Sequence, residues 1–112
     1  MSFYFITSNK NKAKEIKEVI GTELKVLDLR VREIQEIDVE KVVKDKAREA
    51  FSFLKRPVIV EDTGLYIKAW NKFPGALIKW VLKGLGREGI CNFLKNERNA
   101  TAETCFCYYD GK

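Results

Sequence analysis

Two adjacent carboxylates at the end of an apolar strand constrain this chain more than any other feature. Residues 58–60 are all aliphatic and predict a short buried strand, and Glu61 and Asp62 follow it directly. Gly64 is expected to let the backbone turn sharply just after these acids. Buried carboxylates are normally paired with a cation or bound to a metal. Carboxylate oxygens are ligands that Mg²⁺ prefers, usually in sites that also hold substrate phosphates. The pattern indicates either a metal site or a solvated acidic turn, and by itself it favours neither.

A polar turn near the amino terminus predicts an anion site. An apolar run over residues 3–6 is followed by a polar segment over 7–12, and apolar residues then recur at helical spacing. The free N–H groups and the positive dipole end of such a helix attract phosphate, and Asn9 is expected to cap it. Lys12 projects close to the apolar stripe in the first turn, so we expect it to add a positive charge to this turn.

A second lysine lies inside the apolar stripe of a longer predicted helix. Over residues 39–54 the apolar side chains share one face, and Lys46 projects between Val42 and Ala50. Such a lysine either extends its stem along the apolar surface toward solvent or reaches an anion. The residues alone favour the first interpretation.

Alternating strands and helices predict a single α/β domain over residues 1–112, with a mixed β-sheet flanked by helices. The expected strands cover 3–7, 25–30, 58–61, 65–68 and 102–109, and the expected helices cover 10–20, 39–54, 76–83 and 87–95. The last strand ends in Asp110-Gly111, a hairpin-turn signal, and no returning strand follows it in the sequence. We therefore expect its edge to pair with another chain, most simply as a two-fold homodimer.

Composition excludes several classes of protein. Hydrophobic residues make up 46% and charged residues 33% of the chain, which is typical of a globular domain. The absence of histidine excludes Ser-His and Cys-His nucleophilic mechanisms. No apolar run is long enough to span a membrane and no signal peptide is recognisable, so a cytoplasmic location is expected. Cys91, Cys105 and Cys107 are expected to be structural core residues.

The net charge of +5 suits either nucleoside triphosphates or nucleic acid as partner. Tyr4, Trp70 and Tyr108 are not interleaved with the basic residues as stacking platforms usually are, so nucleic acid is the weaker alternative. Trp70 and Trp80 are expected to pack in a core rather than to stack on a base.

Four motifs, in this order and spacing, resemble the amino-terminal part of the inosine triphosphate pyrophosphatase family. They run from Ile6 to Lys12, over Glu33-Ile34-Gln35, from Val60 to Leu65 and from Phe73 to Trp80. The resemblance implies the fold shared by Maf and Ham proteins, without its carboxy-terminal part. It also implies Mg²⁺-dependent hydrolysis of non-canonical purine nucleoside triphosphates to monophosphate and pyrophosphate.

The resemblance also implies roles for particular residues. Glu33 and Asp62 would hold the metal, with Glu61 as an auxiliary acid, and Asp62 would also orient or deprotonate the attacking water. Thr7 and Asn9 would line the first turn. The polyphosphate would be bound by Lys12, Lys46 and Lys79. Each assignment has a structural alternative, such as a surface ion pair between Glu33 and Arg32 or a Lys79 stem that covers Trp80. Later family motifs are absent from the sequence, so a catalytically weakened nucleotide-binding or scaffold protein is the alternative function.

Overall fold

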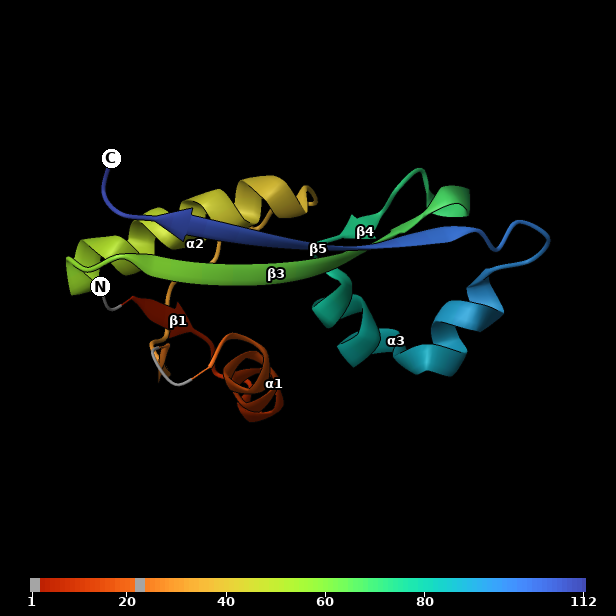
Figure 1. Ribbon diagram of the computed structural model, residues 1–112. Coiled ribbons are helices and arrows are strands. Elements are labelled where there is room, and N and C mark those ends of the chain that lie inside the picture. Colours follow the sequence, from red (N-terminus) through yellow and green to blue (C-terminus); the bar gives the residue numbers. More distant parts are fainter. Residues whose placement is uncertain (1–2, 22–23) are drawn as a thin grey trace. The chain divides into compact units, whose positions relative to one another are not determined.

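The computed structural model describes residues 3–21 and 24–112, which form two compact units. The first unit combines the segment up to Ile34 with Val43–Glu61 and Phe106–Lys112, and the second combines Gln35–Val42 with Asp62–Cys105. Helix α2 (Val39–Leu54) and strands β3 (Val58–Ile67) and β5 (Ala100–Tyr109) contribute residues to both units (Figure 1).

The first unit is built on three parallel strands. Strand β1 (Tyr4–Ile6) lies between β2 (Lys25–Leu27) and the start of β3, with Tyr4 opposite Lys25 on one side and opposite Val58 on the other. Helix α1 (Lys10–Ile20) connects β1 to β2. Because β1 and β3 are parallel, the turn after β1 lies beside the stretch of β3 that ends in Glu61. Ligand sites of α/β proteins commonly form at such strand ends.

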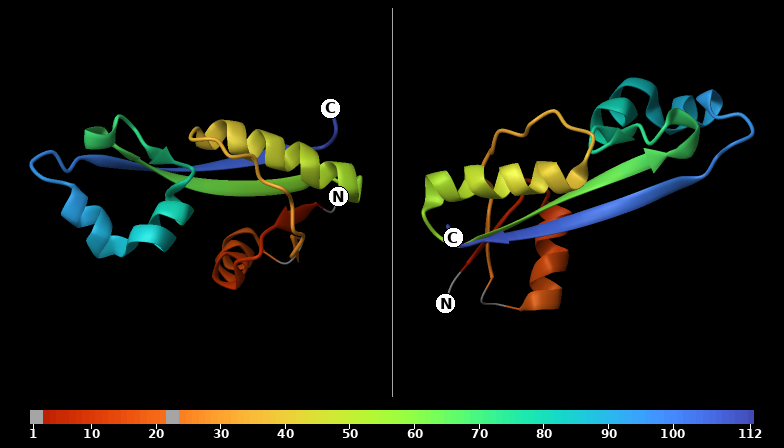
Figure 2. Two further views of the ribbon diagram at one scale, coloured as in Figure 1. Left: turned by 180° about the vertical axis from the view of Figure 1, so that it is seen from behind. Right: turned by 90° about the horizontal axis from the view of Figure 1, so that it is seen from above.

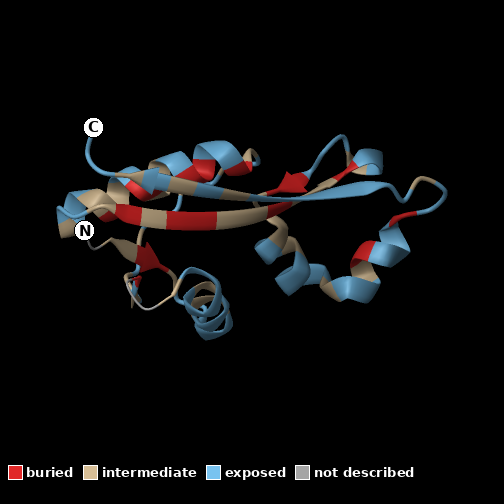
Figure 3. Cartoon of the chain, in the orientation of Figure 1, coloured by how far each residue is buried: buried red, intermediate tan, exposed pale blue. Residues whose placement is uncertain are grey.

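The core of this unit lies between α2 and the strands. Figure 3 shows buried residues in β1, in β3 and on one side of α2, whereas α1 is largely exposed. The buried apolar side chains of this unit are Phe5, Ile6, Leu24, Val43, Ala47, Ala50, Val58 and Val60. The predicted apolar stripe of the helix over 39–54 is therefore confirmed. The end of β5 adds two edge-on aromatic contacts, Tyr108 with Phe3 and Tyr109 with Phe51.

The second unit is organised around the second half of β3. It pairs antiparallel with β4 (Pro74–Gly75) and lies beside β5 (Figure 2). The hydroxyl oxygens of Thr63 in β3 and Thr104 in β5 are 2.9 Å apart. A short 3₁₀-helix, η1 (Lys68–Trp70), follows β3, and α3 (Ile78–Phe93) packs Ile90 against Ile67.

One partly buried hydroxyl fixes the start of α2 in this unit. The Tyr66 hydroxyl accepts a hydrogen bond from Val39 N at 2.9 Å and donates one to Ile37 O at 3.3 Å. Burial raises the pKa of Tyr66 above its ordinary value, against the opposing effect of the Val39 N–H bond. The phenol therefore stays protonated at neutral pH and can keep both hydrogen bonds.

The mixed α/β sheet and the helices over 10–20 and 39–54 are confirmed. The prediction of two separate strands over 58–61 and 65–68 is wrong, because β3 runs without a break from Val58 to Ile67. Gly64 suggested a turn, but it lies in extended backbone where a Cβ would come within 2.4 Å of Val39 Cγ2. It allows close packing instead.

The remaining helices and strands lie closer to their predicted ranges. The two helices expected over 76–83 and 87–95 are both present within α3, where Gly86, with a non-helical φ of 70°, separates the two helical segments. The strand expected over 25–30 ends at Leu27, and β4 was not foreseen. Trp80 does not pack in a core, since 57% of it is exposed. No helix in the described ranges is both long and apolar enough to cross a membrane.

The glycine of β4 provides a test of this packing. Gly75 has φ +56°, and a Cβ there would lie 2.2 Å from Ile37 O, so Gly75→Ala should lower the free energy of unfolding by about 2–3 kcal/mol. Gly84→Ala is the matched control, because its Cβ would meet no atom within 4 Å and helix propensity improves by about 1 kcal/mol. Urea unfolding followed by tryptophan fluorescence measures both. Equal effects of the two substitutions would contradict the described packing of β4.

Candidate functional site

The turn after β1 presents a capped helix N-terminus. Asn9 adopts an extended backbone, and its Oδ1 accepts hydrogen bonds from Asn11 N at 3.0 Å and Lys12 N at 3.2 Å. Thr7 Oγ1 accepts from Asn9 N at 3.1 Å. The expected N-cap is thus confirmed, and the first turn of α1 carries no acidic residue. The positive end of the helix dipole remains available to an anion.

Glu61 is a buried carboxylate that faces this turn. Its side chain is 10% exposed, and its Oε1 accepts from the ammonium of Lys12, which is 38% exposed. Among the residues that the structure describes, Glu61 is the one charged residue classed as buried. A buried carboxylate without a cation costs several kcal/mol, so Lys12 compensates a charge that β3 places in the interior.

Lys46 extends from α2 to Glu33 and to the backbone of Glu61. Its ammonium lies 3.0 Å from Glu33 Oε1 and donates a 3.4 Å hydrogen bond to the backbone carbonyl of Glu61. The Lys46 side chain is only 15% exposed. The ammonium therefore ends at a carboxylate and a carbonyl and not in solvent, contrary to the first interpretation, and its binding to a ligand anion stays a prediction. Glu33 pairs with Lys46, where a pair with Arg32 was the structural alternative.

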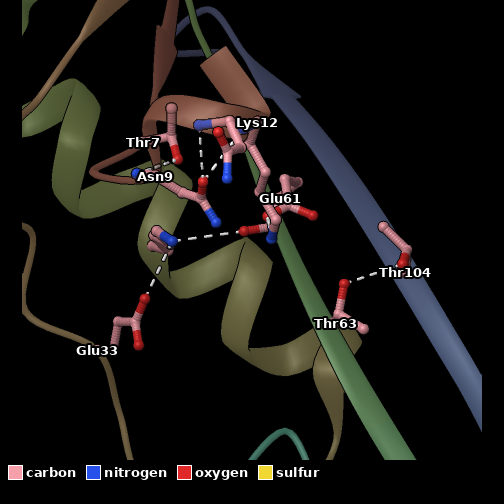
Figure 4. Close-up of polar contacts among 9 residues, drawn as sticks. Thr7, Asn9, Lys12, Glu33, Glu61, Thr63 and Thr104 are labelled. Carbon is pink, nitrogen blue, oxygen red and sulfur yellow. Dashed lines mark hydrogen bonds and ion pairs between the residues drawn. The ribbon is translucent and has the colours of Figure 1, made fainter. Parts of the chain in front are cut away.

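These four side chains form a lysine–carboxylate cluster, defined as Lys12, Lys46, Glu33 and Glu61 (Figure 4). All four belong to the first unit. The cluster carries two positive and two negative charges beside the N-terminus of α1. Ammonium groups suit phosphate oxygens, and carboxylates suit a divalent cation. The arrangement can therefore receive a metal–polyphosphate complex if its more exposed carboxylate, Glu33, exchanges Lys46 for the metal.

The donor chemistry fits Mg²⁺ held jointly by protein and substrate. Within residues 3–21 and 24–112, no group of three or more His, Cys, Asp or Glu side chains is placed to hold a metal by itself. Mg²⁺ usually binds one or two carboxylates and completes its coordination with phosphates and water. Glu33, with 47% of its side chain exposed, can supply such an oxygen.

Asp62 follows Glu61 in β3 and belongs to the second unit. Neighbouring side chains of a strand project to opposite faces, so these two acids are expected to differ in role. The assignment of Asp62 to the metal and to the attacking water stays a prediction.

Lys79 also lies in the second unit, on α3. Its ammonium is 5.3 Å from the centroid of the Trp80 ring, and that of Lys83 is 5.6 Å away. Lys79 therefore covers Trp80, as the structural alternative supposed. Its binding to polyphosphate stays a prediction.

The cysteines differ from the expectation of core residues. Cys91 is exposed, Cys105 and Cys107 are partly buried, and all three are free thiols. Burial, together with Glu103, raises the pKa of Cys105 above its ordinary value. Its thiol therefore stays protonated at neutral pH and is a poor nucleophile.

The second unit holds a cavity of about 710 Å³. Its lining comes entirely from the second unit and includes Tyr66, Lys72 and Glu103. None of its lining residues belongs to the lysine–carboxylate cluster. The cavity therefore does not enter the candidate site.

Parallel β1–α1–β2 connectivity with a capped helix N-terminus beside paired lysines is typical of α/β proteins that bind phosphate groups. The chain belongs to the Ham1 family, whose model matches residues 3–112. It is 39% identical over 111 residues to a protein of Aspergillus fumigatus named inosine triphosphate pyrophosphatase, covering 96% of this chain and 59% of that protein. It is 39% identical over 106 residues to the dITP/XTP pyrophosphatase of Methanopyrus kandleri, covering 92% and 56%.

Solved structures share the fold. A HAM1 protein from Coxiella burnetii superposes with a TM-score of 0.72 at 21% identity, covering 98% of this chain and 64% of that one. The Staphylococcus aureus Ham1 protein gives a TM-score of 0.66 at 23% identity, covering 96% and 63%. The chain thus spans less than two thirds of the length of these relatives, and the expected Ham-type fold is confirmed over that span.

The Lys12–Glu61 pair should contribute measurably to stability. Lys12→Met leaves Glu61 buried without its cation and should lower the free energy of unfolding by about 1–2 kcal/mol, less than for a fully buried pair because Lys12 is partly exposed. Glu61→Gln in the Lys12→Met background should recover part of that loss. Urea unfolding of the parent, both single variants and the double variant gives the coupling energy. Additivity within about 0.3 kcal/mol would contradict the pairing.

Proposed function

We propose that this chain binds nucleoside triphosphates together with Mg²⁺ and hydrolyses them to nucleoside monophosphate and pyrophosphate, with non-canonical purine nucleotides preferred. The lysine–carboxylate cluster beside the α1 N-terminus is the observation that carries this proposal. The names of the relatives from Aspergillus fumigatus and Methanopyrus kandleri support the substrate class.

The polyphosphate would be bound by three lysines, Lys12, Lys46 and Lys79. Lys12 lies in the first turn of α1, where Thr7 and Asn9 organise the backbone N–H groups, and Lys46 pairs with Glu33 in the same cluster. Lys79 would supply a third positive charge. Positive groups fixed before reaction stabilise charge that develops on phosphoryl oxygens, and a triphosphate needs several of them.

Glu33 and Asp62 would hold Mg²⁺, with Glu61 close by as the auxiliary acid. Bound Mg²⁺ would neutralise phosphoryl oxygens and lower the pKa of a coordinated water. Asp62 would orient that water or accept its proton. One water is consumed as the bond between the α- and β-phosphates breaks, and pyrophosphate leaves.

Pyrophosphate release from ITP, XTP, dITP, ATP and GTP, with and without Mg²⁺, tests the proposal. Release from the first three substrates in the presence of Mg²⁺, and none in its absence, is the expected result. Binding of the triphosphates without release would favour the weakened nucleotide-binding or scaffold protein. Neither binding nor release would refute the proposed function.

Asp62→Asn should abolish pyrophosphate release, because the shape of the side chain is kept while its negative charge is lost. The loss should be at least about 100-fold, as is usual for general acid–base groups. A circular dichroism spectrum equal to that of the parent would show that the fold survives. If the variant releases pyrophosphate at the parent rate, Asp62 has no part in the reaction.

We also propose that the chain forms a homodimer. Within the described part of the chain, β5 pairs with β3, and much of β5 is exposed, including 59% of Phe106 and 48% of Tyr108. Apolar side chains on an exposed strand edge favour pairing with another chain. Light scattering at micromolar concentration should give twice the monomer mass, and Phe106→Lys should reduce it to the monomer mass. A parent that is monomeric and folded would contradict this proposal.

A further inference from the structure

The two ion pairs of the lysine–carboxylate cluster differ in which of their two members is buried. In the pair Lys12–Glu61 the carboxylate is the buried member, 10% exposed against 38% for the lysine. In the pair Lys46–Glu33 the lysine is the buried member, 15% exposed against 47% for the carboxylate. The two pairs therefore cannot respond to a ligand in the same way.

The pair with the buried carboxylate is permanent. Glu61 lies in β3 and cannot turn to water, so separation from Lys12 leaves a charge in the interior. The other pair is exchangeable. Glu33 lies in the segment 28–36, which has no regular secondary structure, and its half-exposed carboxylate can turn to water. The Lys46 ammonium that it leaves is 15% exposed and then requires another anion.

Lys46 is held in place without Glu33. Its stem projects from α2 between the buried residues Val42 and Ala50, and its ammonium also donates to the backbone carbonyl of Glu61. When Glu33 leaves, the ammonium keeps its position but loses its neutralising charge. It then attracts a phosphate oxygen more strongly, because one negative charge no longer offsets it.

We propose that Glu33 neutralises the ammonium of Lys46 in the metal-free protein, and that a divalent cation bound to Glu33 frees this ammonium to bind the polyphosphate. The inference rests on the proposed function and adds to it that metal and polyphosphate bind cooperatively through this one pair. Coupling of this kind is reciprocal, so polyphosphate strengthens metal binding by the same factor. Glu33 then acts on the polyphosphate as a positioning residue, through Lys46.

Calorimetric titration of inorganic tripolyphosphate into the full chain tests the inference without turnover. Metal-free protein and protein at a fixed concentration of free Mg²⁺ give two affinities, and their ratio is the metal enhancement. Association of Mg²⁺ with tripolyphosphate in solution is common to all variants and cancels when their ratios are compared.

Glu33→Gln should tighten metal-free binding about three- to fivefold, which is the scale of one partly exposed ion pair. The metal enhancement should fall by at least the same factor. In the Lys46→Met background, Glu33→Gln should change metal-free binding less than about twofold, since only its long-range charge remains to act. Glu97→Gln is the matched control, because it removes one carboxylate from the exposed pair with Lys68 in the second unit.

The inference is overturned if Glu33→Gln leaves metal-free binding unchanged, or tightens it equally with and without Lys46. The proposed function survives that result as long as the parent binds tripolyphosphate with Mg²⁺. If the parent binds tripolyphosphate under neither condition, both the inference and the proposed function fail. Lys46→Gln repeats the cycle if Lys46→Met does not fold, as judged by circular dichroism.

Discussion

The charge of Glu61 is the constraint on which the candidate site depends. Strand β3 carries this carboxylate into the interior, where it requires a cation, and Lys12 provides one from the first turn of α1. The parallel pairing of β1 with β3 makes this possible, because it sets the turn after β1 beside Glu61. Lys46 then reaches the backbone of the same residue from α2. Glu61 thus contacts one lysine through its carboxylate and a second through its backbone carbonyl, beside the N-terminus of a helix.

This arrangement separates stability from ligand binding. The pair built on the buried carboxylate supports the fold, whereas the pair built on the exposed carboxylate is open to exchange. A site composed of balanced charges can remain compact without ligand, since every charge already has a partner. It can also bind a complex whose own charges are complementary. Metal and polyphosphate together meet that condition better than either does alone.

The sequence predicted the features that depend on local spacing. The periodicity of apolar residues located α1 and α2, and Asn9 was identified as an N-cap because its effect is confined to three residues. Gly64 misled the prediction of β3, because a glycine needed for close contact with Val39 looks the same as a glycine needed for a turn. The partners of Lys12 and Lys46 could not be predicted from spacing, since 49 residues separate Lys12 from Glu61. Trp80 was placed in the core from its type, but two lysines cover it at the surface instead.

Backbone amide chemical shifts, recorded while Mg²⁺ and tripolyphosphate are added together, test the central claim most directly. The account predicts saturable shifts of the amides of Asn11, Lys12 and Glu61, which lie in and beside the turn that faces the lysine–carboxylate cluster. The amides of Lys68 and Lys72, in the second unit, provide the reference for unspecific binding to lysines. Shifts that appear at these lysines but not at the turn, or no saturable shift at all, would contradict the claim that the cluster is a polyphosphate site.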